Sequence, residues 1–124
     1  MLKVVLDTNA LFYPFQFKID LEEAIINLIG ACDMLIPDVV VKELISLRNQ
    51  GNKFAGAALR YADRFGTIAT ASSIDTSTDD AILATAIEIS GILVTSDREL
   101  IEKAKDSGVK VIFLRGRQKL ELWG

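Results

Sequence analysis

The chain has 124 residues, of which half are apolar and 25% are charged, and its formal net charge is −3. This length supports one domain with a single hydrophobic core, and the composition excludes a disordered chain. The chain contains no histidine, which excludes histidine-bound zinc and a serine triad with a histidine base, so acid, base or metal chemistry must use carboxylates.

Apolar periodicity and turn residues predict strands that alternate with helices along the whole chain. In chain order the expected elements are a strand at 3–7, a helix at 20–30, a strand at 34–37, helices at 39–48 and 53–65, a short strand at 67–70, a turn-rich loop at 72–78, a helix at 79–90, a strand at 92–95, a helix at 97–107 and a strand at 109–114.

Helix caps support these boundaries. Asp20, Asp38 and Thr78 each precede an apolar periodic run and can cap the helix that follows. Ser96 and Glu99 have the spacing of a capping box for the last helix. The alternation predicts an α/β fold, a three-layer αβα sandwich with a central parallel sheet, in a single domain that spans residues 1–124.

Other features of the sequence indicate whether the protein forms disulfides or crosses a membrane. Cys32 is the lone cysteine, so no disulfide can form within the chain, and its apolar neighbours favour a small buried residue. Charged or polar residues interrupt every apolar stretch before the roughly 18 residues that a membrane span needs. We expect a cytoplasmic protein with no membrane contact.

Several carboxylates fall where strands end or helices begin. Asp7 ends the apolar strand Val4–Leu6, and Asp97 follows the strand at 92–95. Asp79 and Asp80 open a helix, where negative charge is also favourable for structural reasons alone. Glu43 lies about one turn into the helix after the second strand. Since functional crevices of parallel sheets lie beyond the carboxyl ends of the strands, these acids are expected at one rim.

Carboxylates that converge at one rim would repel one another and take up protons unless cations offset their charge. Ligand sets made only of oxygen select hard ions, Mg²⁺ or Mn²⁺. A pair of such ions is a familiar arrangement for in-line displacement at phosphorus. The acid set therefore points to phosphate chemistry that depends on a divalent metal.

The order of four segments resembles the PIN domain family, named after the N-terminus of the PilT protein. These segments are "LDTNAL", the acid in "VKEL", "DDAILATA" and "LVTSDREL". The resemblance covers nearly the whole chain and implies a metal-dependent ribonuclease fold related to flap endonucleases. It places the acidic ligands and catalytic residues at Asp7, Glu43, Asp79 and Asp97, with Asp80 as the alternative to Asp79. Polar positions that orient ligands or waters fall at Thr8, Asn9, Thr95 and Ser96.

Two further segments, "YPFQFKIDLEEAI" and "FLRGRQKLELWG", resemble stand-alone archaeal PIN proteins similar to the ribosomal-RNA-processing branch. An RNA substrate also needs positive charges outside the acids. The candidate nucleic-acid-binding residues are Arg48, Lys53, Arg60, Arg98, Arg115 and Arg117, with ordinary surface charge as the alternative. The aromatic run Phe12, Tyr13, Phe15 and Phe17 could stack bases, but burial is the favoured interpretation.

We interpret the chain as a metal-dependent endoribonuclease of single-stranded RNA that forms a homodimer and could act in RNA processing, with a ribosome-assembly partner. The alternatives are a toxin ribonuclease of a VapC-like toxin–antitoxin pair, with a small antitoxin as partner, and a catalytically silent module that binds RNA or protein. A phosphatase of the haloacid-dehalogenase type would need an aspartate two residues after Asp7, where this chain has Asn9. A receiver domain would need paired acids after the first strand.

Overall fold

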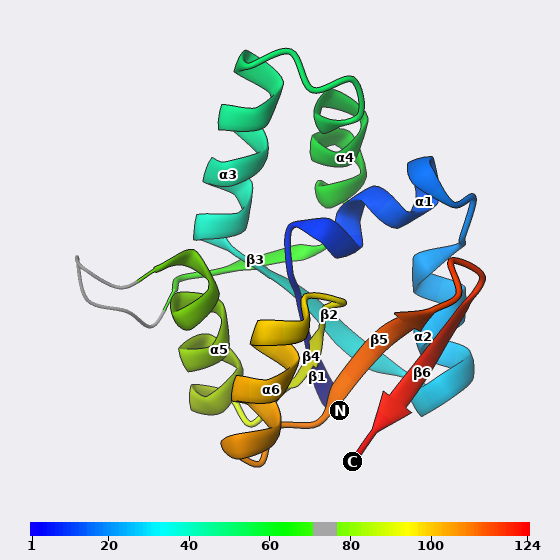
Figure 1. Ribbon diagram of the computed structural model, residues 1–124, viewed down its shortest axis with the longest axis vertical. Coiled ribbons are helices and arrows are strands. Elements are labelled where there is room, and N and C mark those ends of the chain that lie inside the picture. Colours follow the sequence, from blue (N-terminus) through cyan, green and yellow to red (C-terminus); the bar gives the residue numbers. More distant parts are fainter. Residues whose placement is uncertain (71–76) are drawn as a thin grey trace.

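The computed structural model describes residues 1–70 and 77–124, in which a central sheet is covered by helices on both sides (Figure 1). The predicted three-layer α/β architecture is confirmed. The elements are β1 (Leu2–Leu6), the 3-10 helix η1 (Asn9–Phe12), α1 (Tyr13–Gln16), α2 (Leu21–Ile29), β2 (Cys32–Pro37), α3 (Asp38–Asn49), α4 (Ala55–Ala62), β3 (Gly66–Ile68), α5 (Thr78–Glu88), β4 (Ile92–Val94), α6 (Arg98–Asp106), β5 (Val111–Arg115) and β6 (Lys119–Trp123).

The strand order in the described part of the sheet is β3-β2-β1-β4-β5-β6. The first five strands of the chain are parallel to one another, as the sequence predicts. The chain builds outward from β1 in one direction through β2 and β3, and then in the other direction through β4 and β5. The order therefore reverses between β1 and β4, which is where sheets of this kind place their ligand crevice.

The sequence analysis missed β6, which pairs with β5 in the antiparallel direction. The turn that joins these strands contains Gly116 and Arg117, both with positive φ, and a glycine adopts that conformation at little cost. The prediction of a parallel sheet therefore holds for β1 to β5, and an antiparallel hairpin completes one edge.

The helices form the two outer layers. In Figure 1 α5 and α6 lie side by side across one face of the sheet, whereas α2 lies behind β5 and β6 on the other face. The helices α3 and α4 pack against each other and project beyond the strand ends. The central strands are apolar because both of their faces are covered: Val4, Val5, Leu6 and Leu93 have no exposed surface.

Three of the predicted helix caps differ from the structure. Asp38 is the first residue of α3, and its Oδ1 accepts hydrogen bonds from the backbone N–H and the hydroxyl of Thr70, just after β3. Ser77, not Thr78, caps α5 by accepting a hydrogen bond from the Asp80 N–H at 3.2 Å. The capping box at the last helix is also wrong, because Asp97 is the cap of α6.

Other boundaries shift by a few residues. The helix expected at 53–65 is shorter, and the loop expected after the first strand contains η1 and α1 instead. Most of the turn-rich loop expected at 72–78 lies outside the described residues. In the part of the chain that the structure describes, no helix has the length and the apolar character needed to cross a membrane.

Candidate active site at the carboxyl ends of the central strands

Asp7 is a carboxylate held inside the protein by hydrogen bonds. It follows β1, and its side chain is only 4% exposed. Its Oδ1 accepts a hydrogen bond from the Ala10 N–H at 2.8 Å, and its Oδ2 accepts one from the Thr95 hydroxyl at 2.5 Å. The 3-10 turn η1 brings the Ala10 N–H back over the end of the strand. Both carboxylate oxygens are therefore fixed by neighbouring segments on opposite sides of the β1–β4 boundary.

Thr95 connects Asp7 to Asp97. The Thr95 hydroxyl donates to Asp7 and accepts from the Asp97 N–H at 3.2 Å, and Thr95 itself has no exposed surface. The Oδ1 of Asp97 accepts a hydrogen bond from the Leu100 N–H at 3.1 Å in the first turn of α6. This bond fixes the orientation of the Asp97 carboxylate beside the switch in strand order.

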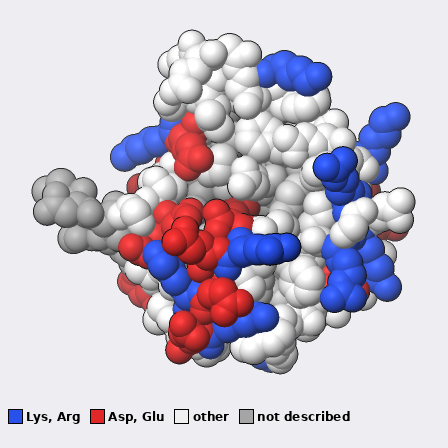
Figure 2. Space-filling view, in the orientation of Figure 1, with Lys and Arg blue, Asp and Glu red and all other residues white. Residues whose placement is uncertain are grey.

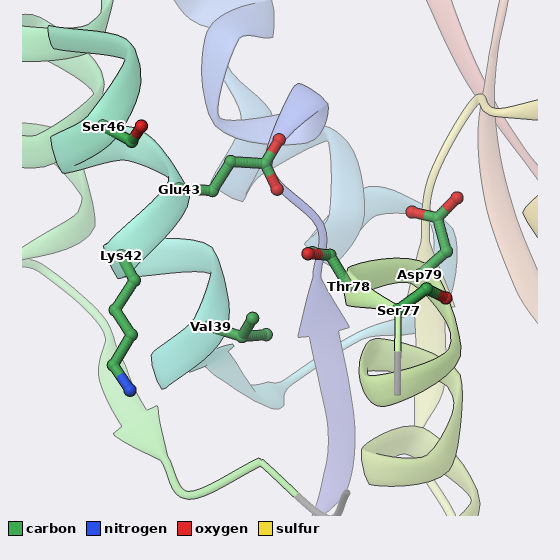
Figure 3. A pocket seen from close by; sticks show the side chains of 7 residues that line it. All are labelled: Val39, Lys42, Glu43, Ser46, Ser77, Thr78 and Asp79. Carbon is green, nitrogen blue, oxygen red and sulfur yellow. The ribbon is translucent and has the colours of Figure 1, made fainter. Parts of the chain in front are cut away.

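Glu43 and Asp79 lie on two walls of one open pocket of about 590 Å³ (Figure 3). Glu43 comes from α3 and Asp79 from the first turn of α5, and in Figure 3 their carboxylates lie on either side of the end of β1. Lys42, Ser46 and Thr78 also line this pocket. The two acids thus reach the same hollow from helices that are distant in the sequence.

Electrostatic coupling links Asp7, Asp79 and Asp97. Burial raises the pKa of Asp7 to about 7, against the lowering effect of the Thr95 and Ala10 hydrogen bonds, and the charges of Asp79 and Asp97 raise it further. The pKa of Asp79 is also raised, first by burial and then by the charge of Asp97. Three carboxylates therefore share one electrostatic environment in which a proton or a cation is favoured.

The donor set suits a hard divalent cation, although the side chains of the described residues do not surround one point. As placed, no group of three or more acidic, cysteine or histidine side chains in residues 1–70 and 77–124 is arranged to hold a metal ion together. The chemistry nevertheless fits, because the donors are all oxygens and a cation would offset both the burial and the neighbouring charges that raise the pKa of Asp7. Thr8 Oγ1 adds a buried oxygen with no hydrogen-bond partner among the described residues.

The other predicted polar positions are spread around this centre. Asn9 is exposed and begins η1. Asp80, the alternative to Asp79, points away into an ion pair with Lys103 at 3.0 Å, in which both side chains are about half exposed. Within this pair Lys103 donates a hydrogen bond to Asp80 Oδ1, and this bond is the main cause that lowers the pKa of Asp80. The structure therefore places Asp79, and not Asp80, on the pocket wall.

The sequence analysis missed a contact between Tyr13 and Ser96. Its hydroxyl donates a 2.6 Å hydrogen bond to Ser96 Oγ, which also accepts one from the Leu114 N–H at 2.9 Å. Burial raises the pKa of Tyr13, and the nearby charge of Asp7 raises it further. The burial expected for the aromatic run holds for Phe12 and Tyr13. Tyr13 and Ser96 are 83 positions apart, and no local sequence motif predicts a contact over that separation.

Figure 2 shows acidic side chains gathered around a hollow near the middle of this face, with Lys and Arg side chains over the β5–β6 hairpin to one side. Arg98 and Arg115 line a groove next to Ser96. Arg117 lies over the Phe17 ring at 5.9 Å. Helices α3 and α4 and the segment between them carry the remaining candidate nucleic-acid-binding residues, which are Arg48, Lys53 and Arg60.

The sequence is similar to archaeal proteins that are named as ribonucleases. A family model described as PIN like domain matches residues 4–117. Ribonuclease VapC9 of Archaeoglobus fulgidus is 33% identical over 115 residues, which cover 90% of this chain and 82% of that protein. Ribonuclease VapC4 of Methanocaldococcus jannaschii is 28% identical over 129 aligned positions, which cover 100% of this chain and 98% of that protein.

The fold is similar to a solved endonuclease structure. The PIN domain endonuclease Utp24 superposes with a TM-score of 0.79 and 26% sequence identity. The superposition covers 97% of this chain and 90% of Utp24. The similarity in sequence and the similarity in structure therefore extend over the same, nearly complete, length of the chain.

Proposed function

This chain belongs to the PIN-like domain family, and two of its relatives are named as ribonucleases. We propose that it is a metal-dependent endoribonuclease that hydrolyses phosphodiester bonds of single-stranded RNA. The observation that carries the proposal is the buried Asp7 carboxylate, coupled to Asp79 and Asp97 beside a pocket that Glu43 also lines. Two relatives named as ribonucleases and a similar endonuclease fold support it.

In this proposal Asp7, Glu43, Asp79 and Asp97 hold Mg²⁺ or Mn²⁺. Such an ion, when bound, supplies a lowered pKa for water and stabilisation of charge on the phosphate. The chain itself positions the acids: Thr95 fixes one oxygen of Asp7, and the hydrogen bond from the Leu100 N–H fixes Asp97. Because these hydrogen bonds exist before substrate binds, they keep the orientations of the Asp7 and Asp97 carboxylates fixed during the reaction.

Cleavage of a labelled single-stranded RNA tests the proposal. Purified protein should cut the RNA with Mg²⁺ or Mn²⁺, and excess chelator should stop the reaction. Asp7→Asn should abolish cleavage, because a neutral amide cannot offset a cation. Asp33→Asn is the matched control, since Asp33 is exposed near the start of β2, at the opposite end of the sheet. Unchanged cleavage by Asp7→Asn would show that the activity does not come from this site.

A second candidate role is that of a toxin ribonuclease, which the VapC names of both relatives favour. The chemistry would be the same, but the chain would also bind a small antitoxin. The adjacent gene distinguishes the roles, because a toxin should be encoded beside a small partner and an RNA-processing protein should not. Expression of the chain alone should then arrest growth, and coexpression of that partner should restore it.

A binding module without catalysis would keep the fold and lose the reaction. Stabilisation by Mn²⁺ together with an absence of RNA cleavage would favour that alternative over the enzyme.

We also propose that the chain forms a homodimer, consistent with exposed apolar side chains such as Ile26, Ile45 and Ile87. Sedimentation equilibrium would give a mass close to that of one chain if the dimer proposal is wrong.

A further inference from the structure

A second groove lies beside the acids, between the start of α6 and the end of β5. Its volume is about 330 Å³, within the lower range of small-molecule pockets. Ser96, the residue before Asp97, lines the groove. Arg98 and Arg115 are exposed residues that line it, and the half-buried apolar residues that line it are Ile101, Phe113 and Leu114. The groove therefore combines an apolar surface with two permanent positive charges.

The apolar part of the groove suits a flat ring. Phe113 is half buried, so its ring is held by the protein and still reaches the groove. Unpaired nucleobases stack on such rings regardless of sequence, because each base has a π face. A rigid aromatic side chain also loses little conformational freedom when a base covers it.

The charged part of the groove suits a phosphate. Arg98 and Arg115 carry guanidinium groups, whose planar donors match phosphate oxygens. Arg115 forms an ion pair with Glu121, with 3.2 Å between Arg115 Nε and Glu121 Oε2, but the Arg115 side chain is 70% exposed. An exposed pair of this kind contributes little to stability, so a phosphate can replace Glu121 as the partner of Arg115.

Ser96, which lines the groove, lies between two residues of the candidate active site in the sequence. Its hydroxyl is fixed by Tyr13 and the Leu114 N–H, and the residues on either side of it are Thr95, which binds Asp7, and Asp97. Acids alone repel a phosphodiester, so a strand that reaches them needs a positive anchor close by. Arg98 follows Asp97 directly in the sequence and is an exposed positive charge close to the acids.

From this arrangement we infer that the groove binds a nucleotide of single-stranded RNA next to the one that is cut, with its base on Phe113 and its phosphate between Arg98 and Arg115. The inference rests on the proposed function and adds a binding subsite to it. The RNA strand then runs from the acids toward the β5–β6 hairpin, where Figure 2 shows basic side chains. The subsite selects for single strands, because stacking requires an unpaired base.

Binding measurements test the subsite separately from cleavage. The probes are a short labelled oligouridylate and an oligomer of the same ribose-phosphate length without bases, with fluorescence anisotropy as the readout. The full chain carries Asp7→Asn so that the RNA stays intact. Arg98→Gln and Arg115→Gln should each weaken binding of both probes and reduce the slope of log Kd against log salt by about 0.7. Lys110→Gln, at the opposite end of β5, removes an exposed charge and should change neither.

The aromatic contact has its own variants. Phe113→Leu should weaken binding of the oligouridylate by roughly fivefold or more and leave the baseless oligomer unaffected. Phe113→Tyr keeps the ring and should restore the affinity. Glu121→Gln removes the competing carboxylate and should tighten binding of both probes. If a Phe113 variant fails to fold, the unsubstituted groove must still bind the oligouridylate more tightly than the baseless oligomer.

Two results would overturn the subsite. One is that Arg98→Gln and Arg115→Gln bind RNA as Lys110→Gln does, and the other is that Phe113→Leu affects both probes equally. The chain with Asp7 intact is assayed for cleavage in parallel. Binding that depends on Arg98 without any cleavage would contradict the proposed hydrolysis and leave the subsite standing, whereas cleavage with groove-independent binding would contradict the subsite alone.

Discussion

Asp7 is a carboxylate in a place where ionisation is costly. Burial, together with the charges of Asp79 and Asp97, raises its pKa from the ordinary 3.8 to about 7, even though Thr95 and Ala10 donate hydrogen bonds to it. A purely structural role would be served better by a neutral side chain, because Asn accepts the Ala10 hydrogen bond without the desolvation cost. A buried acid that weakens the fold at neutral pH is the kind of residue that function retains.

This pKa shift gives a prediction for the metal-free protein. Between about pH 4 and about pH 7 the folded state keeps a proton on Asp7 that the unfolded chain has released. The free energy of unfolding should therefore fall as pH rises through that window, by an amount on the order of a few kcal/mol. Urea unfolding in excess chelator at several pH values measures it. Asp7→Asn should flatten the profile, and parallel curves for the two proteins would contradict the assignment.

Thr95 gives a second prediction at this scale. Thr95→Val leaves a buried Asp7 oxygen and the Asp97 N–H without their partner. Loss of these bonds should lower the free energy of unfolding by about 1–3 kcal/mol and also reduce cleavage. Thr95→Ser keeps the hydroxyl and serves as the control in the same urea titration. Equal stability of the Val variant and the parent would mean that the bonds contribute nothing.

At the residue scale, the sequence indicates which acids and polar residues are candidates for the site, but not that Tyr13 contacts Ser96. Asp7 stands out because an acid ends an apolar strand, and Glu43, Asp79 and Asp97 follow from the order of the motifs. The roles of Tyr13 and of Ser96 are different. Ser96 has the spacing of a helix cap, yet its hydroxyl bridges Tyr13 and Leu114. Such a contact depends on how three segments pack, which local spacing does not encode.

Among the elements, α6 couples a structural task to a functional one. Asp97 caps this helix and also contributes charge to the acid group. Asp97→Ala should lose cleavage and about 0.5–2 kcal/mol of stability, because the cap bond to Leu100 is gone. Asp97→Asn keeps a capping oxygen and should lose cleavage at nearly parental stability. Thermal unfolding and RNA cleavage of both variants separate the roles, and an active Asn variant would remove Asp97 from the ligand set.

Helices and parallel strands were predictable because their periodicity is local. The antiparallel strand β6 was not, because it is short, two of its five residues are charged, and only Leu120 is buried, so its burial does not alternate. The link between Asp38 and Thr70 was also missed, since it joins the start of α3 to the end of β3 across 32 positions. In each case the missing information is a long-range pairing, and not a local preference.

The whole molecule should respond to metal as a single cooperative unit. A ligand that binds only the folded state at about a hundred times its Kd stabilises the fold by about 2.7 kcal/mol. Mn²⁺ should therefore raise the Tm of the parent, and Asp7→Asn should lose most of that increase. Asp33→Asn should retain it, because Asp33 lies at the opposite end of β2. A Tm that Mn²⁺ leaves unchanged would count against a metal centre of any kind.

The reversal of strand order has a consequence for when the protein becomes active. Asp7 and Glu43 come from the first half of the chain, whereas Asp79 and Asp97 come from the second, on either side of the boundary between β1 and β4. A partly synthesised chain that has emerged only as far as β3 carries half of the acids and none of the groove. Under the proposed function, such a nascent polypeptide cannot damage the messenger or the ribosome that is still making it.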